Sequence, residues 1–329
     1  MHVRFLVPGN VRHGSGGNKY NAKLAEHLAA LGADIETVVV DGDWPVGSPA
    51  DRQRFAEALD GGATVIADGL VAGGAPDEIA GAAGKGTKVW ILSHIALADH
   101  DDLEAKALAA AAGIICPSAH AAAELGAKYG ALDVVVATPG AASAGVSAGS
   151  VPTHIVSVAA LLPNKSQTLL VEALSQLHNL EWSASLIGSH DPDPAYAAKV
   201  RDAVEHYGLQ QRVTLTGELT GQELEDHWHK ADLSILLSRS ESFGMVVTES
   251  LAHGVPVIVR QGTGAVEALG GTGAGAALDL SDLNTLTMTL RAWLTDPALQ
   301  QRWRNNALQA RQHLRGWDAT AATVLKAIT

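Results

Sequence analysis

The sequence has 329 residues, a length that predicts about two domains. Hydrophobic residues make up 47% and charged residues 18%, which excludes an intrinsically disordered chain. No apolar stretch approaches the ~20 residues of a membrane-spanning helix. The net charge of −12 is spread over both halves, so neither half is a basic surface for nucleic acid.

The composition also limits the disulfide and metal chemistry that we expect. A single cysteine, Cys116, excludes an internal disulfide framework. The start MHVRFLVPG lacks the basic region and long apolar stretch of a signal peptide, so we expect a cytoplasmic protein. The 14 histidines are scattered, and His227 and His229 would point to different sides of a helix. We therefore expect no structural zinc.

Short apolar runs alternate with helical patterns in the first half, as in a parallel sheet covered by helices. The pattern predicts strands at 3–7, 35–40, 64–67, 89–92, 113–116 and 134–137. It predicts helices at 18–31 and 50–59, and further helices between and after the later strands.

A segment rich in Gly, Ser and Ala follows at 139–152, and its lack of periodicity predicts a domain linker. The alternation then restarts, with strands predicted at 155–159, 182–187, 213–215, 233–237 and 257–259. Helices are predicted at 166–178, 194–207, 221–230, 244–253, 282–294 and 297–314, before a tail at 317–328.

The predicted fold class is therefore α/β, with two Rossmann-like, doubly wound parallel-sheet domains facing a central cleft. The domain boundaries are expected at 1–148 and 149–312. Ligands of such folds bind at the carboxyl ends of the strands, so functional residues are expected there.

Three glycines, Gly14, Gly16 and Gly17, lie between the first strand and the first helix. Glycine lets the backbone approach a ligand closely, and a helix N-terminus favours anions. As a nicotinamide dinucleotide fingerprint the segment is poor, because Lys19 occupies the third glycine position, although Asp41 could imitate a ribose-binding acid. On this segment alone, a flexible turn and a ligand-binding loop are both open interpretations.

The most specific pattern is SRSESFGMVVTESLAHGVPVIV at 238–259, directly after a predicted strand. Seven residues separate Glu241 from Glu249, and Phe243 and Gly244 open a helix that Gly254 ends. A carboxylate at the strand tip, unpaired helix N–H groups and a second carboxylate further along can together hold the oxygen atoms of a phosphate and a sugar.

In this segment the chain resembles the retaining GT-B glycosyltransferases of family 4, whose E-x7-E signature matches Glu241 and Glu249. The resemblance extends to the glycine loop and to SVAALLPNKSQTLLVEAL at 157–174. It also covers SLIGSH at 185–190, TLTGEL at 214–219 and GTGAVEAL at 262–269. It further implies that the last segment, 313–329, is a helix that packs back on the N-terminal domain.

The resemblance implies roles for individual residues. A nucleotide-diphosphate sugar would lie on the C-terminal domain, with Glu249 at the ribose, Glu241 at the transferred sugar and Lys165 at the leaving diphosphate. His94 would reach the transferred sugar; the alternative is a polar residue that ends a strand. The remaining donor-binding candidates are Gly16, Gly17, Gly188, Gly217, Phe243, Gly244, Met245 and Val246.

One position departs from the family pattern. The family pairs its lysine with an arginine in a G-R-L segment, where this chain has Ala159, Ala160 and Leu161. Loss of that cation would weaken the stabilisation of the leaving group, by about 3 to 4 kcal/mol if it resembles removal of an oxyanion donor. Three interpretations stay open: another cation substitutes, the donor differs, or catalysis is lost. The nearest candidate cations by motif position are Arg239, Arg260 and Arg12.

The expected function is transfer of a hexose, with retention of configuration, from a donor such as a UDP- or GDP-hexose to an acceptor hydroxyl. The DPD triplet at 191–193 is not a D-x-D metal site in this context, so we expect neither a metal ion nor a further cofactor. The alternatives are a non-catalytic sugar-nucleotide-binding or partner protein, and an epimerase or phosphorylase on the same fold. Membrane association is expected to be weak at most, and the oligomeric state stays open.

Overall fold

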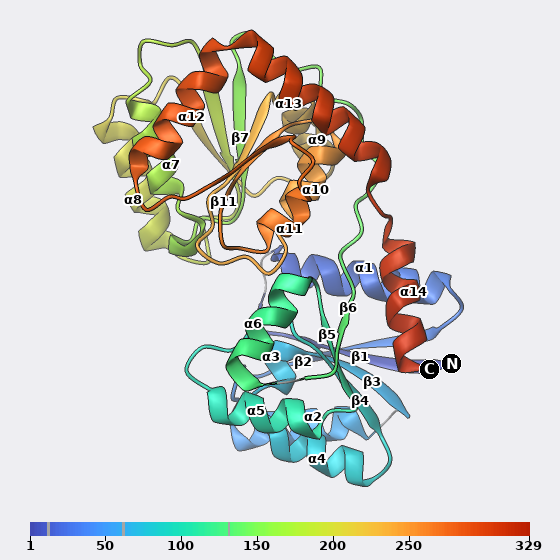
Figure 1. The fold of residues 1–329 in the computed structure, drawn as a ribbon. Helices are drawn as coiled ribbons and strands as arrows, with labels where there is room; N and C mark the ends of the chain where they lie inside the picture. The colour runs from blue at the N-terminus through green and yellow to red at the C-terminus, as the bar shows by residue number, and fades with distance from the viewer. Residues whose placement is uncertain (12–13, 61–62, 131) are drawn as a thin grey trace. The chain divides into compact units, whose positions relative to one another are not determined.

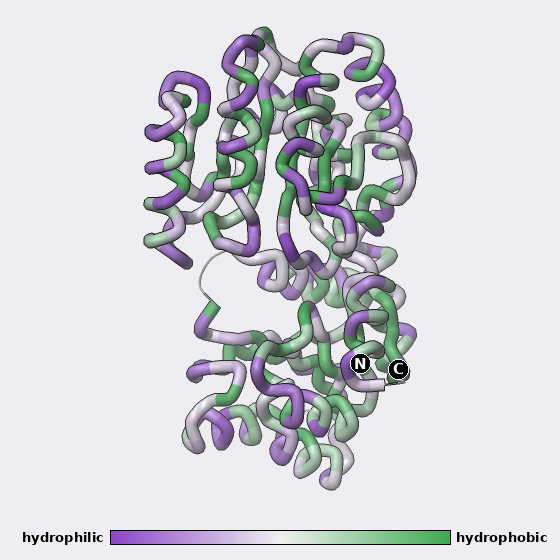
Figure 2. Tube along the Cα trace, turned by 60° about the vertical axis from the view of Figure 1, so that its left-hand side comes forward, coloured by the Kyte–Doolittle hydropathy of each residue, from purple (hydrophilic) through white to green (hydrophobic). Residues whose placement is uncertain are grey.

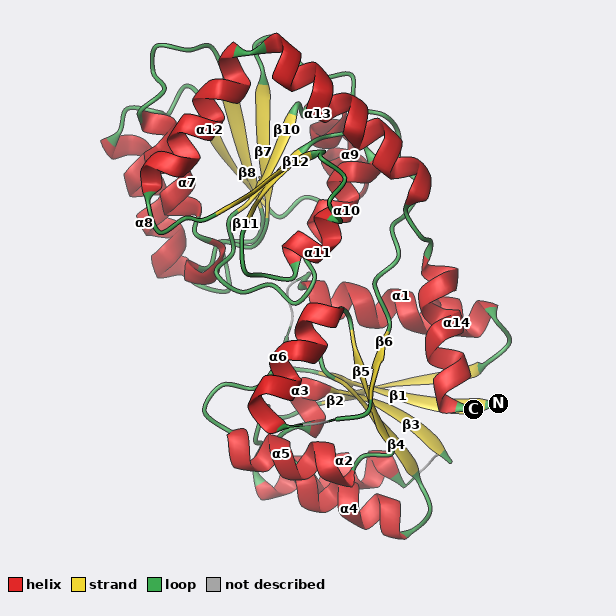
Figure 3. Cartoon of the chain, viewed as in Figure 1, coloured by secondary structure: helices red, strands yellow, loops and turns green. Residues whose placement is uncertain are grey.

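The computed structural model describes residues 1–11, 14–60, 63–130 and 132–329. These residues form two compact units, the first from Met1–Gly140 with Arg315–Thr329 and the second from Ala141–Leu314. Each unit contains a six-stranded parallel sheet flanked by helices (Figures 1 and 3). The α/β class with two parallel sheets, predicted from the alternating pattern, is confirmed.

The sheet of the first unit has the order β2-β1-β3-β4-β5-β6. Its strands are β1 (His2–Pro8), β2 (Asp34–Val40), β3 (Thr64–Asp68), β4 (Lys88–Leu92), β5 (Gly113–Cys116) and β6 (Val134–Val136). Its helices are α1 (Gly16–Ala30), α2 (Pro49–Leu59), α3 (Gly69–Ala72), α4 (Pro76–Gly84), α5 (Asp101–Ala110), α6 (Ala119–Tyr129) and α14 (Trp317–Ile328). Although α1 and α14 lie at opposite ends of the sequence, they pack side by side (Figure 1).

The sheet of the second unit has the order β12-β11-β10-β7-β8-β9. Its strands are β7 (His154–Val158), β8 (Ser183–Ile187), β9 (Val213–Gly217), β10 (Leu233–Leu236), β11 (Val257–Arg260) and β12 (Gly275–Leu278). Its α-helices are α7 (Gln167–Ser175), α8 (Pro194–His206), α9 (Gly221–Lys230), α10 (Met245–Ala252), α11 (Ala265–Leu269), α12 (Leu283–Thr295) and α13 (Pro297–Ala310). Two short 3-10 turns are η1 (Pro163–Lys165) and η2 (Arg311–His313).

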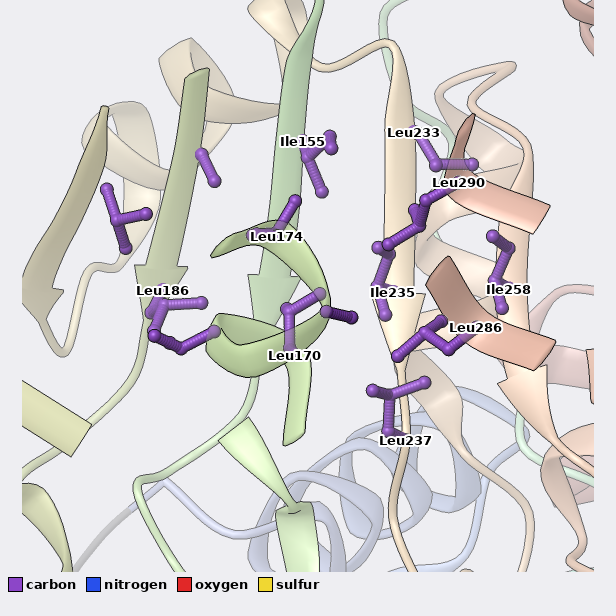
Figure 4. Packing of buried hydrophobic residues seen from close by; sticks show 14 of the residues in the cluster. Ile155, Leu170, Leu174, Leu186, Leu233, Ile235, Leu237, Ile258, Leu286 and Leu290 are labelled. Carbon is purple, nitrogen blue, oxygen red and sulfur yellow. The ribbon is translucent and has the colours of Figure 1, made fainter. Parts of the chain in front are cut away.

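Alternation along each strand divides the core of the second unit into layers. Ile155 of β7 faces the cluster that α7, α8 and α12 cover, whereas Val156 faces the opposite cluster with Trp228 of α9. Side chains of α7 and α12 lie across the strands in Figure 4, with Leu170 and Leu174 over β7. Burial on both faces favours apolar residues at successive positions, which is why these strands appear as short, mostly apolar runs with single buried serines such as Ser234. Figure 2 shows hydrophobic stretches through the middle of each unit.

Some elements of the structure were not predicted from the sequence. The pattern did not predict β12 or α3, because a Gly- and Ala-rich edge strand and a four-residue helix have no measurable periodicity. The predicted linker at 139–152 has no helix or strand, and the unit boundary falls at Gly140. Among the described residues, no helix combines the length and apolar character needed to cross a membrane.

Truncating a side chain in this core should destabilise the second unit. Leu174 is fully buried in the cluster that contains Trp182. We expect Leu174→Ala to lower the free energy of unfolding by about 2–5 kcal/mol, because the leucine leaves a cavity. Urea unfolding followed by tryptophan fluorescence measures this change. As a control, Met288→Ala changes a side chain that is 69% exposed and should alter stability by less than about 0.5 kcal/mol.

Candidate functional site

Two loops of the second unit meet where β7 and β10 end. These strands are neighbours in the sheet and run parallel, with Leu233 opposite Ile155, so their carboxyl ends lie at the same edge. Lys165 Nζ lies 2.5 Å from Glu241 Oε1. Ser238 Oγ donates a hydrogen bond of 2.7 Å to the same oxygen. The structure therefore brings together two of the predicted catalytic residues.

Asn164 fastens these two loops to each other. Its side-chain Nδ2 donates to Ser240 O at 3.1 Å, and its Oδ1 accepts from Ser240 N at 3.0 Å. Its backbone oxygen accepts a third bond of 2.8 Å from Arg239 N. Because all three bonds reach the segment just before Glu241, Asn164 determines where that carboxylate lies relative to Lys165.

The backbone beside Ala160 is closely packed. A Cβ on Gly188 would lie 2.0 Å from Ala159 O, so only glycine fits there. Gln167 Nε2 donates to Ala160 O at 2.9 Å, and Gln167 Oε1 is buried without a hydrogen-bond partner among the residues that the structure describes. Gly188 N donates to Gly217 O at 2.8 Å, and Gly217 adopts a φ of 80° with open space where its Cβ would be. The two glycines thus hold β8 and β9 against the loop after β7.

The turn before α10 exposes backbone groups close to Glu241. Gly244 has a φ of 82°, a conformation that disfavours other residues, and Met245 and Val246 form the first turn of the helix. Phe243 is buried against the helix. Gly264 N donates to Glu241 O at 2.7 Å, and a Cβ on Gly264 would lie 2.2 Å from Ser242 O. The loop before α11 therefore supports the backbone of the 241–244 turn.

Glu249, in the second turn of α10, has a carboxylate oxygen with unmet hydrogen-bonding capacity. Its Oε2 is buried and has no hydrogen-bond partner in the described part of the chain. Its backbone oxygen accepts from the ring Nδ1 of His253 at 2.7 Å, and the other ring nitrogen of His253 lies 3.0 Å from Glu225 Oε2. A buried carboxylate oxygen without a donor is costly, so a ligand hydroxyl that reached this atom would meet an acceptor with unused capacity.

Two of the three candidate substitute cations lie near the same sheet edge. Arg260 ends β11 and donates from Nε to Leu237 O at 3.0 Å. Burial, and then the nearby Arg239 charge, lowers the pKa of Arg260, and Asp279 opposes this shift. Neither arginine has a carboxylate partner within ion-pair distance among the residues described. Arg12 lies outside the described residues.

The other predicted residues lie in the first unit. Gly16 and Gly17 begin α1, whose N-cap Ser15 accepts from Asn18 N at 3.1 Å. His94 follows β4, and a Cβ on Gly17 would lie 3.2 Å from its ring. Gly17 therefore makes room for the imidazole, a role that its position in a glycine loop did not suggest.

His94 faces two buried polar side chains. Its Nε2 lies 2.8 Å from Asn21 Oδ1 and 3.6 Å from Asp68 Oδ2. Asn21 Nδ2 donates to Asp68 Oδ2 at 2.6 Å. Burial lowers the pKa of His94, and the Asp68 carboxylate opposes this shift. Within the described residues, no group of three or more His, Cys, Asp and Glu side chains is arranged to hold a metal ion.

The C-terminal part of the chain matches a known family. Residues 148–310 fit the family model described as glycosyl transferases group 1. This segment is therefore similar to the domains of group 1 glycosyl transferases. The D-inositol 3-phosphate glycosyltransferase of Kineococcus radiotolerans is 30% identical over 188 residues, covering 51% of this chain and 42% of that protein. The chain spans less than half the length of such curated relatives.

Solved glycosyltransferase structures share the fold of the whole chain. Sucrose-phosphate synthase from Thermosynechococcus elongatus has a TM-score of 0.84 at 19% identity, covering 99% of this chain and 98% of that one. Anabaena HepE in complex with UDP and glucose has a TM-score of 0.82 at 16% identity, with 99% of both chains covered. The two units of the chain therefore have the α/β fold of these solved structures, which is the GT-B fold.

Four residues of these two clusters were not singled out from the sequence. Asn164 and Ser238 flank the Lys165 and Glu241 pair, and Asn21 and Asp68 face His94. Asp68 and Ser238 each follow a predicted strand closely, which is a usable signal. Asn164 and Asn21 have no such signal, because their partners are distant in the sequence.

The hydrogen bonds by which Asn164 joins the two loops, here called the Asn164 clamp, can be tested through stability. We expect Asn164→Ala to remove two hydrogen bonds and to lower the free energy of unfolding by about 1–3 kcal/mol, because the amide and carbonyl of Ser240 lose their partners. Urea unfolding measures this loss. A matched control is Asn305→Ala, which alters an exposed amide that accepts from Gln301 within α13. Equal stability of the two variants would contradict the clamp.

Proposed function

We propose that this chain is a cytoplasmic glycosyltransferase that moves a hexosyl group from a nucleoside diphosphate sugar to the hydroxyl of a small acceptor. The observation that carries the proposal is the cluster at the carboxyl edge of β7 and β10. There Lys165 is paired with Glu241, and Glu249 on the helix that follows has an oxygen to which no described residue donates. The segment that fits the group 1 model contains all three residues.

Lys165 suits the leaving group of such a reaction. A departing nucleoside diphosphate develops negative charge, and a fixed ammonium group stabilises it. Glu241 neutralises Lys165 in the free protein, so the diphosphate would compete with Glu241 for the lysine. Glu241 would then be released to accept hydrogen bonds from hydroxyls of the transferred sugar.

Glu249 suits the ribose. Vicinal hydroxyls are donors that match a carboxylate, and bonds to a charged acceptor are stronger than neutral ones. Glu249 lies in the helix whose first turn contains Met245 and Val246, and the N–H groups of a first turn have no acceptor within the helix, so they can donate to phosphate and sugar oxygens. HepE, a structural neighbour, is described in complex with UDP and glucose, which supports a UDP-hexose as the first donor to examine, followed by a GDP-hexose.

Retention of configuration and independence from a divalent metal ion belong to the same proposal. Both rest on the resemblance of the 238–259 segment to retaining enzymes of family 4. No further cofactor is proposed. The acceptor would be bound chiefly by the first unit, where His94 follows β4 and Gly16 and Gly17 begin α1.

Ala160 supports a second candidate function. The position that the resemblance assigns to an arginine contains an alanine, whose carbonyl oxygen accepts from Gln167. A chain that lacks this cation could bind a sugar nucleotide without transferring the sugar. Arg260 and Arg239 are the described cations that could replace the missing charge.

The donor site is tested with purified protein and UDP-, GDP- and ADP-sugars. We expect saturable binding and donor hydrolysis or transfer for at least one. Lys165→Ala should reduce turnover by roughly 10²–10³-fold, because a charge that stabilises the transition state is lost. Glu249→Ala should weaken donor binding by about 10- to 100-fold. Calorimetry and product chromatography measure these effects, and product anomers report the stereochemistry.

Met288→Ala is the control for the donor experiment, since this exposed residue of α12 belongs to neither the Lys165 and Glu241 pair nor α10. Turnover should persist in the presence of a chelator. Full activity of both site variants would remove the site assignment. An isomerised sugar nucleotide formed without an acceptor would instead indicate an epimerase, and a sugar phosphate formed with inorganic phosphate would indicate a phosphorylase.

The missing arginine is tested by Ala160→Arg. If catalysis has degenerated, this substitution should raise donor hydrolysis or affinity by at least tenfold, because a bidentate cation is restored beside the diphosphate. If Arg260 already supplies the charge, Ala160→Arg should have little effect on an active protein, and Arg260→Ala should reduce its turnover. Steady-state kinetics of the two variants therefore separate enzyme from binding protein.

A further inference from the structure

Three polar side chains of the first unit form a hydrogen-bonded row beside α1. Asp68 at the end of β3 is 4% exposed, and Asn21 of α1 is 3% exposed. Asp68 Oδ1 accepts from Leu70 N at 2.8 Å, and Asp68 Oδ2 accepts from Asn21 Nδ2 at 2.6 Å. Asn21 Oδ1 then lies 2.8 Å from His94 Nε2. Both carboxylate oxygens of Asp68 are thus used as acceptors.

The chemistry of these groups allows only one arrangement of protons along the row. A carboxylate accepts and cannot donate, so the Asn21 amide must turn its NH2 group toward Asp68. The carbonyl oxygen of Asn21 therefore faces His94 and can only accept. His94 must donate from Nε2, and in the neutral ring Nδ1 is then a bare acceptor.

We propose that Asp68 and Asn21 are positioning residues that hold His94 as the Nε2-protonated, neutral imidazole, so that Nδ1 offers its lone pair to a hydroxyl of the bound saccharide. The hydrogen-bonded row stands on this structure alone. The identity of its ligand rests on the proposed function.

The surroundings of His94 fix the plane of the ring as well as its tautomer. Tyr20 meets it edge to face at a centroid distance of 5.2 Å, and Tyr20 is itself held by a bond from its hydroxyl to Ala137 O. Trp317 of α14 packs against the far side of Tyr20 at 5.3 Å. With Gly17 against the ring, the imidazole has little freedom to turn over.

The free nitrogen is available to a ligand. His94 Nδ1 makes no hydrogen bond to any residue that the structure describes. It is not one of the fully buried side-chain atoms without a partner, so a small part of its surface is accessible. Burial also lowers the pKa of His94, which favours the neutral ring, against the opposing charge of Asp68. A bare Nδ1 accepts from a hydroxyl and does not attract a phosphate, so this group selects a neutral sugar or polyol.

The test uses the tautomer itself as the readout. Long-range ¹H–¹⁵N spectra of the free, full-length protein identify which ring nitrogen carries the proton, and His94→Gln assigns the signals. We expect Nε2–H in the natural protein. Asp68→Asn should invert the tautomer: its oxygen still accepts from Leu70 N, its NH2 group forces Asn21 to turn over, and the Asn21 amide then donates to Nε2.

Asp296→Asn provides a matched control, because Asp296 also accepts backbone N–H bonds as a helix N-cap. Asp296→Asn should leave the His94 signals unchanged. Neither Asp296→Asn nor Asp68→Asn should change the signals of His154. The proposal that Asp68 and Asn21 fix the tautomer of His94 would be wrong if the natural protein carried Nδ1–H, or if the Asp68→Asn protein kept Nε2–H. The first measurement needs no variant of Asp68, so it decides even if that variant misfolds.

Kinetics with UDP-glucose, or with the donor found active, test the role of Nδ1. Inversion by Asp68→Asn should lower kcat/KM by about 10- to 100-fold, because an acceptor is replaced by a donor facing the same hydroxyl. An inverted tautomer with unchanged kcat/KM would overturn that role. If the natural protein transfers no sugar at all, the proposed function fails. The spectra still decide whether Asp68 and Asn21 fix the tautomer of His94.

Discussion

The candidate donor site depends on the parallel pairing of β7 with β10. This pairing places two loops, 76 positions apart in the chain, at one sheet edge, where Lys165 and Glu241 form an ion pair. The hydrogen bonds of Asn164 hold both loops in place. A charged pair built in this way is neutral while the site is empty, and it can offer a cation to a phosphate and a carboxylate to a sugar once a ligand separates it.

Glycines at this edge serve the backbone as much as any ligand. Gly188 lies against Ala159, and Gly264 lies against Ser242, at separations that exclude even one methyl group. Such contacts let the backbones of neighbouring loops pack directly against each other, with no side chain between them. The same principle applies in the first unit, where the absence of a side chain at Gly17 leaves room for the His94 ring. These glycines therefore serve close packing, whether or not a ligand also lies against them.

Each unit keeps buried polar groups of a kind that packing alone does not explain. In the second unit, Glu249 Oε2 and Gln167 Oε1 are buried and have no hydrogen-bond partner in the ranges that the structure describes. In the first unit, the buried Asp68 accepts a hydrogen bond from Asn21, and Asn21 in turn contacts the ring of His94, which follows β4. A buried polar atom without a partner lowers stability, and a hydrogen-bonded row fixes the positions of protons. Both features are typical of sites that act on ligands. At Ala160, by contrast, the positive charge that the family resemblance implies is absent.

The sequence by itself determined the α/β class, the strand and helix alternation, and the segment around Glu241 and Glu249, because periodicity and local motifs are properties of neighbouring residues. It did not reveal β12, whose Gly- and Ala-rich strand has no alternation. Only the tertiary structure decided that Asn164 joins Ser240, that Gly17 accommodates His94, and that Asp68 and Asn21 set its hydrogen bonds. These contacts join residues far apart in the chain, and sheet order, which no local pattern encodes, brings them together.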